Sequence, residues 1–356
     1  MNIEDAINLI SSGKNLTFGE AEVVMGIVMG GQVSSPKIVA LLTALRIKGE
    51  SPDELAGFAT AMRKHCQVIR PNVSGTLVDT CGTGGDHIKT FNTSTIAAII
   101  VAGAGGCVAK HGNRSVTSKC GSADLMEGFG VNLSAEPKIV ENCIAKIGLG
   151  FMFAPIFHPA MKYATEARRQ IGTKTVFNLL GPLTNPASAK AQLVGVYHPS
   201  LTEKICTVLK KLGVERAYVV HGLIGVDEIS IIGKTKLSEL NQNKIHTYEI
   251  YPKLFGVNAT TKVEDIVCGD LSQSLKISIQ ILNGVKGPKT DMAVLNAAAV
   301  LVLCERVKTI EEGVEVAYDA VVSGRALNKL RFLVKESGGD LAKLEEVENE
   351  FHKGSC

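Results

Sequence analysis

Hydrophobic and polar positions in the first 65 or so residues follow the spacing of short amphipathic helices. Apolar residues recur at 38, 41, 42 and 45, which places their side chains on one helical face. Two capping boxes, at 17–20 and 51–54, indicate helix starts. A third start is indicated by Ser35 as the cap before Pro36. The pattern predicts three or four short helices, which must pack on each other or on a partner chain because burial stabilises them.

After Pro71 the pattern changes to short apolar runs that alternate with helical segments. One predicted strand begins at 77, and the others cover 107–109, 192–197, 217–220 and 229–232. This alternation predicts an α/β fold with a mostly parallel central sheet and helices on both faces. We expect a small N-terminal helical domain over residues 1–70, completed by helices within about 165–190, and a larger α/β domain over 71–356.

Composition excludes several classes of protein. The 356 residues carry 38 Lys and Arg against 35 Asp and Glu, a net charge of +3, so we expect no nucleic-acid partner. The uncharged stretch over 96–109 is shorter than the ~20 residues of a membrane-spanning helix. The acidic N-terminus lacks the features of a signal peptide, and nine scattered cysteines favour reduced thiols. We therefore expect a cytoplasmic protein without a membrane partner.

A glycine-rich segment, Gly-Thr-Gly-Gly-Asp at 82–86, follows the first predicted strand. Its glycines allow backbone N–H groups to converge on an anion, although a tight turn would need the same residues. The spacing fits neither a dinucleotide fingerprint nor a Walker loop. Five hydroxyl or amide side chains at 90–95 precede a helical run. Together with the free N–H groups of a helix start, they favour phosphate, whereas capping alone would need only one of them.

A second polar segment, Lys-His-Gly-Asn-Arg-Ser at 110–115, follows the second predicted strand and continues to 124. Cations and small donors at a strand end favour a polyanion cradle. A solvated charged loop is the alternative interpretation, and His111 alone would more often be structural than catalytic.

Three further features are each open to two interpretations. Asp227 and Glu228 could bind Mg²⁺ beside a phosphate site, or lie in a solvated turn. One arginine of the pair at 168–169 could bind a substrate carboxylate, or both could lie on an exposed helix. The apolar, proline-containing segments at 151–155 and 158–159 could form a wall for a flat aromatic ligand, or belong to the core.

Five motifs together resemble the anthranilate phosphoribosyltransferase family. They lie at 82–86, 90–92, 110–114 and 227–228, and at 178–186, where the sequence is Asn-Leu-Leu-Gly-Pro-Leu-Thr-Asn-Pro. The resemblance is collinear over nearly the whole chain. It implies a helical domain packed on a larger α/β domain, Mg²⁺ as cofactor, and a homodimer formed through the helical part. The implied reaction joins anthranilate to phosphoribosyl pyrophosphate and releases pyrophosphate, in tryptophan biosynthesis.

The resemblance also implies the role of individual residues. The set that would hold phosphoribosyl pyrophosphate consists of glycines, hydroxyls and charged residues: Gly82, Gly85, Asp86, Thr90, Asn92, Thr93, Ser94, Thr95, Lys110, His111, Gly112, Asn113, Arg114, Ser115, Val116, Thr117, Ser118 and Ser122. Anthranilate would contact Gly82, Asn113 and Arg168, with Arg168 pairing its carboxylate. Mg²⁺ would be held by Ser94, Asp227 and Glu228. No general acid or base is expected, because the aromatic amine is a free base at neutral pH.

Three positions depart from the family pattern: His87 replaces a usual glycine, Thr93 an isoleucine and Cys120 a common serine. These changes bear on substrate affinity and leave the reaction class intact. A pyrimidine nucleoside phosphorylase-like enzyme is an alternative, but the carboxylate pair at 227–228 and the run at 110–114 speak against it. A non-catalytic nucleic-acid-binding relative would need a basic surface, which a net charge of +3 does not supply.

Overall fold

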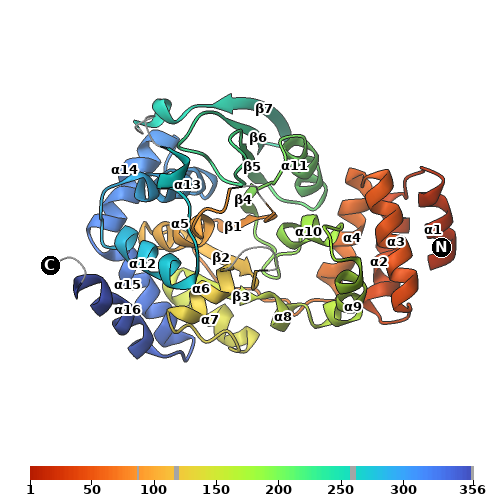
Figure 1. Ribbon diagram of the computed structural model, residues 1–356, viewed down its shortest axis with the longest axis horizontal. Helices are drawn as coiled ribbons and strands as arrows, with labels where there is room; N and C mark the ends of the chain where they lie inside the picture. The colour runs from red at the N-terminus through yellow and green to blue at the C-terminus, as the bar shows by residue number, and fades with distance from the viewer. Residues whose placement is uncertain (86–87, 116–119, 257–261, 354–356) are drawn as a thin grey trace.

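The computed structural model describes residues 1–85, 88–115, 120–256 and 262–353, which form a helical unit beside an α/β unit (Figure 1). The helical unit contains six helices: α1 (Ile3–Ser11), α2 (Phe18–Met29), α3 (Ser35–Lys48), α4 (Pro52–Lys64), α9 (Lys162–Ile171) and α10 (Phe177–Leu180). Although α9 and α10 come much later in the chain, α9 packs on α2 and α3, and α10 packs on α4.

The helix starts in this unit follow from capping. Thr17 with Glu20, and Ser51 with Glu54, form the two predicted capping boxes, and each carboxylate reaches the backbone of its cap residue. The prediction for α3 was wrong by one residue. Ser34 is the N-cap and makes no side-chain capping bond, so the proline lies one position further into the first turn.

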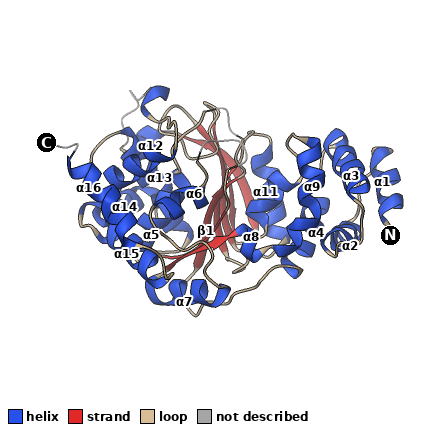
Figure 2. Cartoon of the chain, turned by 60° about the horizontal axis from the view of Figure 1, so that its bottom comes forward, coloured by secondary structure: helices blue, strands red, loops and turns tan. Residues whose placement is uncertain are grey.

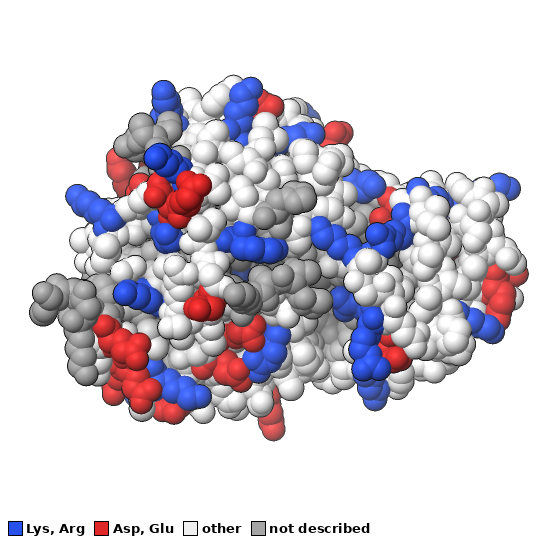
Figure 3. Space-filling view, viewed as in Figure 1, with Lys and Arg blue, Asp and Glu red and all other residues white. Residues whose placement is uncertain are grey.

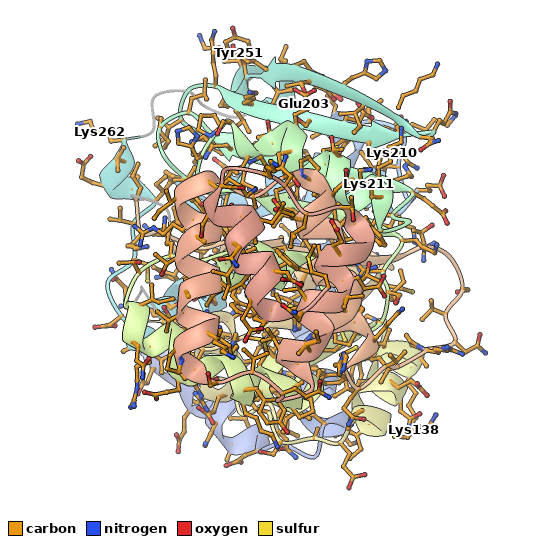
Figure 4. All side chains as sticks on the ribbon, turned by 90° about the vertical axis from the view of Figure 1, so that its right-hand side faces the viewer. Lys138, Glu203, Lys210, Lys211, Tyr251 and Lys262 are labelled. Carbon is orange, nitrogen blue, oxygen red and sulfur yellow. The ribbon has the colours of Figure 1, made fainter. Side chains whose placement is uncertain are left out.

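Contacts between apolar side chains join the helical unit to the sheet. The buried apolar residues of the helical unit form one cluster with those of α11 (Leu201–Lys211) and with those on one face of β4 (Ala191–Gly195) and β5 (Arg216–Gly222). At the margin, Lys211 of α11 pairs with Asp53 of α4 at 2.9 Å; Figure 4 shows Lys211 beside the N-terminal helices. The helical unit is therefore fixed on the face of the sheet that α11 covers.

A seven-stranded sheet forms the centre of the α/β unit, in the order β3-β2-β1-β4-β5-β6-β7. Besides β4 and β5, its strands are β1 (Leu77–Gly82), β2 (Cys107–Gly112), β3 (Leu149–Phe153), β6 (Thr235–Asn241) and β7 (Lys244–Ile250). The first five strands in this order are parallel, and β6 and β7 are antiparallel. Helices cover both faces (Figure 2), so the predicted mostly parallel α/β fold is confirmed.

The predicted strand at 229–232 was wrong. Side chains hold its backbone groups instead of a neighbouring strand. The amide of Asn296 bonds the N–H and the carbonyl of Ile229, and the Ser230 hydroxyl bonds both groups of Ile232. The segment is a compact turn, which directs the preceding residues towards the end of β1.

The larger core surrounds α5 (Thr93–Gly103), a buried helix that packs against β1 and β2. The helices of the rest of this unit are α6 (Ser122–Gly128), α7 (Pro137–Ile147), α8 (Ala154–Phe157), α12 (Leu271–Leu282), α13 (Pro288–Leu303), α14 (Ile310–Val322), α15 (Arg325–Glu336) and α16 (Leu341–Lys353). In the described part of the chain, no helix has the length and apolar character to cross a membrane.

Candidate active site

A cavity of about 320 Å³ opens at the carboxyl ends of β1 and β2, where parallel sheets commonly bind ligands. Seventeen of the residues proposed from the sequence line it: Gly82, Gly85, Thr90, Asn92, Thr93, Ser94, Thr95, Lys110, His111, Gly112, Asn113, Arg114, Ser115, Ser122, Arg168, Asp227 and Glu228. Asp86, Val116, Thr117 and Ser118, and also His87, lie outside the described residues. Lys and Arg side chains gather on the surface where the two units meet (Figure 3).

The glycine loop, residues 82–85, extends β1 into the cavity. Gly84 and Gly85 have φ values of 63° and 78°, the left-handed region that glycine adopts without strain. The Asp227 carboxylate holds the loop, because its Oδ2 accepts a 3.0 Å hydrogen bond from the Gly84 N–H. A Cβ on Gly82 would lie 2.5 Å from the same oxygen, so this contact requires glycine. A carboxylate from a distant turn therefore sets the position of the loop.

The start of α5 lies beside the loop and is held by a second carboxylate and a buried cation. Glu228 Oε1 accepts a 3.2 Å bond from the Ser94 N–H. Lys110, which is 1% exposed, directs its Nζ to the Thr80 carbonyl at 2.5 Å and the Ser94 hydroxyl at 3.4 Å. Burial lowers the pKa of Lys110, and the nearby Asp79 carboxylate opposes that shift. Ser94 thus lies between a carboxylate and an ammonium group, as expected near bound phosphate and metal.

The loop after β2 is held by side chains of α6, the helix that follows it. The Ser122 hydroxyl accepts a 3.2 Å bond from the Asn113 N–H. Arg114 pairs with Asp124 at 2.8 Å and with Glu127 at 2.7 Å, and the hydrogen bonds to Glu127 and then Asp124 raise its pKa. The charge of Arg114 is therefore already paired with carboxylates of α6.

Arg168 and Arg169 differ sharply in environment. Arg168 is half-buried at the cavity, its guanidinium carbon lies 5.3 Å from the centre of the Phe177 ring, and burial lowers its pKa. Within the described residues no carboxylate pairs with it. Arg169 is exposed and pairs with Glu166 at 2.7 Å. Of the two, only Arg168 offers the cavity a partly desolvated positive charge that a substrate carboxylate could neutralise.

Asp227 and Glu228 have the donor chemistry of a magnesium site. They are 9% and 7% exposed, line the cavity, and contact the glycine loop and the α5 start respectively. Mg²⁺ favours one or two carboxylates completed by water and substrate phosphate. Among the described residues, no group of three or more His, Cys, Asp or Glu could hold a metal by itself. The residues present therefore fit Mg²⁺ that is bound together with a phosphate substrate.

His111 and His158 form a buried pair beneath the cavity, with ring centres 5.0 Å apart. The Nε2 atom of each ring is buried and has no hydrogen-bond partner within the described structure. Burial lowers the pKa of His111 to about 4 and that of His158 to about 3. Both imidazoles are therefore neutral at physiological pH. His111 presents a neutral ring to the cavity.

The motif at 178–186 supports the cavity through buried hydrogen bonds to the sheet. Asn185 donates from Nδ2 to Asp79 at 2.7 Å and to the Ala109 carbonyl at 2.9 Å. Gln192 of β4 donates to the Pro182 carbonyl at 3.0 Å. By contrast, the segments at 151–155 and 158–159 do not line the cavity. The buried apolar residues of these segments belong to the core, which was the alternative to an aromatic-ligand wall.

Sequence reasoning missed several cavity residues, including Cys81, Lys89, Phe177 and Asn178. It also missed Lys174, which contacts the glycine loop from the segment between α9 and α10. The only sequence signal was position, because residues 174–177 directly precede the recognised motif at 178–186.

Comparisons with known proteins agree over most of the chain. Residues 4–66 match the helical bundle domain of a glycosyl transferase family, and residues 74–327 match its a/b domain. The anthranilate phosphoribosyltransferase of Acetivibrio thermocellus is 47% identical over 92% of this chain and 94% of its own. That of Desulfatibacillum aliphaticivorans is also 47% identical, over 93% and 97% of the two chains.

Solved structures give the same result. The anthranilate phosphoribosyltransferase of Thermus thermophilus superposes with a TM-score of 0.89 at 38% identity, covering 94% of this chain and 99% of its own. The Saccharomyces cerevisiae enzyme in complex with PRPP and Mg has a TM-score of 0.85 at 25% identity, covering 94% and 98%. Its complex with 4-fluoroanthranilate has a TM-score of 0.84 at 25% identity, covering 94% and 97%.

Proposed function

Because the chain belongs to the anthranilate phosphoribosyltransferase family, we propose that its cavity transfers the phosphoribosyl group of phosphoribosyl pyrophosphate to the amine of anthranilate. The products are N-(5-phosphoribosyl)anthranilate and pyrophosphate, and the name of the family places the reaction in tryptophan biosynthesis. The observation that carries the proposal is one cavity in which anion-binding backbone and a buried lysine lie beside Arg168, a half-buried cation without a carboxylate partner among the described residues.

The two substrates divide the cavity between them. Phosphoribosyl pyrophosphate occupies the glycine loop, the start of α5, the 110–115 loop and Ser122, where N–H groups, hydroxyls and Lys110 are gathered. Anthranilate lies against Gly82, Asn113 and Arg168, with its carboxylate on the guanidinium. The yeast enzyme has been solved in complex with PRPP and Mg and in complex with 4-fluoroanthranilate, which supports the choice of these two substrates.

The reaction is a displacement at C1 of the ribose. The bond from C1 to the pyrophosphate oxygen breaks, the anthranilate nitrogen bonds to C1, and the nitrogen loses a proton to solvent. Positive charge develops on the ribose while the leaving group gains negative charge, so catalysis depends on neutralising pyrophosphate and holding the amine in line. Lys110 and the N–H donors serve the first need; Asn113 and Arg168 serve the second.

Mg²⁺ would be held by Ser94, Asp227 and Glu228. When bound, it supplies Lewis-acid neutralisation of the phosphate charges. The structure of the yeast enzyme with PRPP and Mg supports the choice of metal.

We also propose a helical domain over residues 1–70, completed by helices within about 165–190, and an α/β domain over 71–356. We further propose that the protein forms a homodimer through the helical domain and is located in the cytoplasm. Exposed apolar side chains of the helical unit, Val23 on α2 and Ile47 on α3, support an interface there. Light scattering on the purified protein would test it, with a monomeric mass as the contrary result. The phosphorylase-like alternative is not favoured, because the relatives found share one activity by name.

Anthranilate fluorescence tests the function. Purified protein, phosphoribosyl pyrophosphate and Mg²⁺ are mixed with anthranilate, and a parallel reaction contains a chelator. Metal-dependent loss of fluorescence supports the proposal. No loss with a folded protein, combined with release of base from a pyrimidine nucleoside in phosphate, would contradict it in favour of phosphorolysis.

A further inference from the structure

Lys174 reaches the glycine loop from the other unit of the molecule. Its Nζ donates a 2.7 Å hydrogen bond to the Gly85 carbonyl and lies 3.9 Å from the centre of the Tyr197 ring. A Cβ on Gly85 would lie 2.4 Å from the Lys174 Cε, so the glycine leaves the space that the lysine side chain fills. The lysine side chain therefore packs directly against the backbone of Gly85.

The segment that carries Lys174 is anchored in the helical unit. It connects α9, which packs on α2 and α3, to α10, which packs on α4 (Figure 1). Its neighbour Thr173 accepts a hydrogen bond from Arg46 of α3. Lys174 thus joins the loop of one unit to the framework of the other.

The second partner of Lys174 is itself tied to the loop. Tyr197 follows β4, and its N–H donates to the Thr83 hydroxyl at 3.1 Å. The Thr83 N–H in turn donates to the Gly195 carbonyl at 2.9 Å. An ammonium group over an aromatic ring is attracted by the ring's negative face, so Tyr197 helps to hold the amine at Gly85.

This contact has a consequence for an anion in the loop. Left-handed glycines lose much backbone freedom when they are ordered, and a carbonyl oxygen facing a phosphate repels it. An ammonium on the Gly85 carbonyl neutralises that oxygen and fixes the peptide before substrate arrives. Such preorganisation strengthens binding because less ordering remains to be done.

On the basis of the function proposed above, we propose that Lys174 is a positioning residue of the phosphoribosyl pyrophosphate site, which fixes the glycine loop from the helical unit. It acts through Gly85, not by contact with the reacting atoms. Anthranilate is assigned to Arg168 and Asn113, and it meets the glycine loop only at Gly82, which lies against Asp227 and not Lys174. Anthranilate binding should therefore depend much less on Lys174.

Steady-state kinetics on Lys174→Met and Lys174→Arg test the proposal. Methionine keeps most of the stem without the charge, and we expect the KM for phosphoribosyl pyrophosphate to rise about tenfold. The KM for anthranilate should change less than twofold. Arginine can also donate to a carbonyl and stack on an aromatic ring, so it should restore the KM to within about threefold.

Lys162→Met is the matched control. Lys162 is a lysine of α9 whose Nζ lies 5.0 Å from the centre of the Tyr163 ring. Its removal takes the same kind of cation–ring contact from the helix that precedes Lys174, and should leave both KM values unchanged. Melting temperatures of all variants show whether they fold like the starting protein.

The outcomes separate this proposal from the proposed function. An unchanged KM for phosphoribosyl pyrophosphate in active Lys174→Met contradicts it, as does an equal rise in both KM values. If the starting protein has no transferase activity, calorimetry with phosphoribosyl pyrophosphate and Mg²⁺ still compares binding by the variants. Weaker binding by Lys174→Met alone then supports the positioning role although the proposed reaction has failed. No binding to the starting protein overturns both proposals.

Discussion

Replacing Arg168 with alanine should remove most of the affinity for anthranilate while leaving that for phosphoribosyl pyrophosphate intact. Arg168 is half-buried, stacks on Phe177, and has no carboxylate partner within the described residues. Burial has already removed part of its hydration, so a substrate carboxylate meets a cation that needs little further desolvation. Alanine would leave that carboxylate in the cavity without a counter-charge.

The size of the effect follows from the pairing. A hydrogen bond to a charged group contributes about 1.5–3 kcal/mol, and a guanidinium can make two such bonds to one carboxylate. We take a loss of about 3 kcal/mol, which corresponds to about a 150-fold fall in kcat/KM for anthranilate. Arg168→Lys keeps a point charge but loses the planar guanidinium, so its kcat/KM for anthranilate should lie between those of the starting protein and Arg168→Ala.

Initial rates at varied concentrations of each substrate measure the effect, with Arg169→Ala as the matched control. Arg169 is the adjacent, exposed arginine and pairs only at the surface with Glu166, so its loss should change either KM less than twofold. Removal of a partly desolvated cation should not lower the melting temperature of Arg168→Ala. Equal losses for both substrates, or equal effects at Arg168 and Arg169, would refute the assignment.

Three further predictions concern the metal, pH and stability. Asp227→Asn combined with Glu228→Gln should raise the Mg²⁺ concentration for half-maximal activity about tenfold or more, and an unchanged titration would remove this pair from the metal site. Since burial lowers the pKa of His111 and His158 below their ordinary value, the unfolded chain takes up protons as pH falls below 6.5 while the folded protein does not. Each histidine should thus lower the free energy of unfolding by about 1.4 kcal/mol between pH 7.5 and 5.5, measured by urea titration. His158→Phe should halve the combined loss from the two histidines, and an unchanged pH dependence in this variant would exclude His158 as a source. Glu54, fully buried, accepts bonds from two backbone N–H groups and a buried lysine, so Glu54→Ala should cost about 3 kcal/mol in the same assay, with a loss below about 1 kcal/mol as the contrary result.

Local signals in the sequence were sufficient where one short segment determines its own structure. The capping boxes of α2 and α4 are complete within four residues, and both are formed as predicted. The glycine loop and the 110–115 loop follow β1 and β2 directly, so their meeting at one edge of the sheet could be expected from the parallel arrangement.

Features that depend on distant partners could not be predicted in this way. The apolar run at 229–232 has the composition of a strand, but Asn296, far along the chain, bonds its backbone. The β6–β7 hairpin was missed because β7 is largely exposed and the turn uses Gln242 and Asn243 at φ 47° and 62° in place of glycine. Arg168 was chosen over Arg169 from the family resemblance alone, and the physical difference between them, burial beside Phe177 against a surface pair with Glu166, comes from the packing of α9.

Measuring both products of one reaction shows whether this cavity joins phosphoribosyl pyrophosphate to anthranilate. Protein, Mg²⁺ and the two substrates are incubated, pyrophosphate is quantified, and the anthranilate product is identified by mass spectrometry. We expect equal amounts of pyrophosphate and N-(5-phosphoribosyl)anthranilate, with both lost in Arg168→Ala at low anthranilate. Pyrophosphate without the anthranilate product, or neither product from a folded protein, would contradict it.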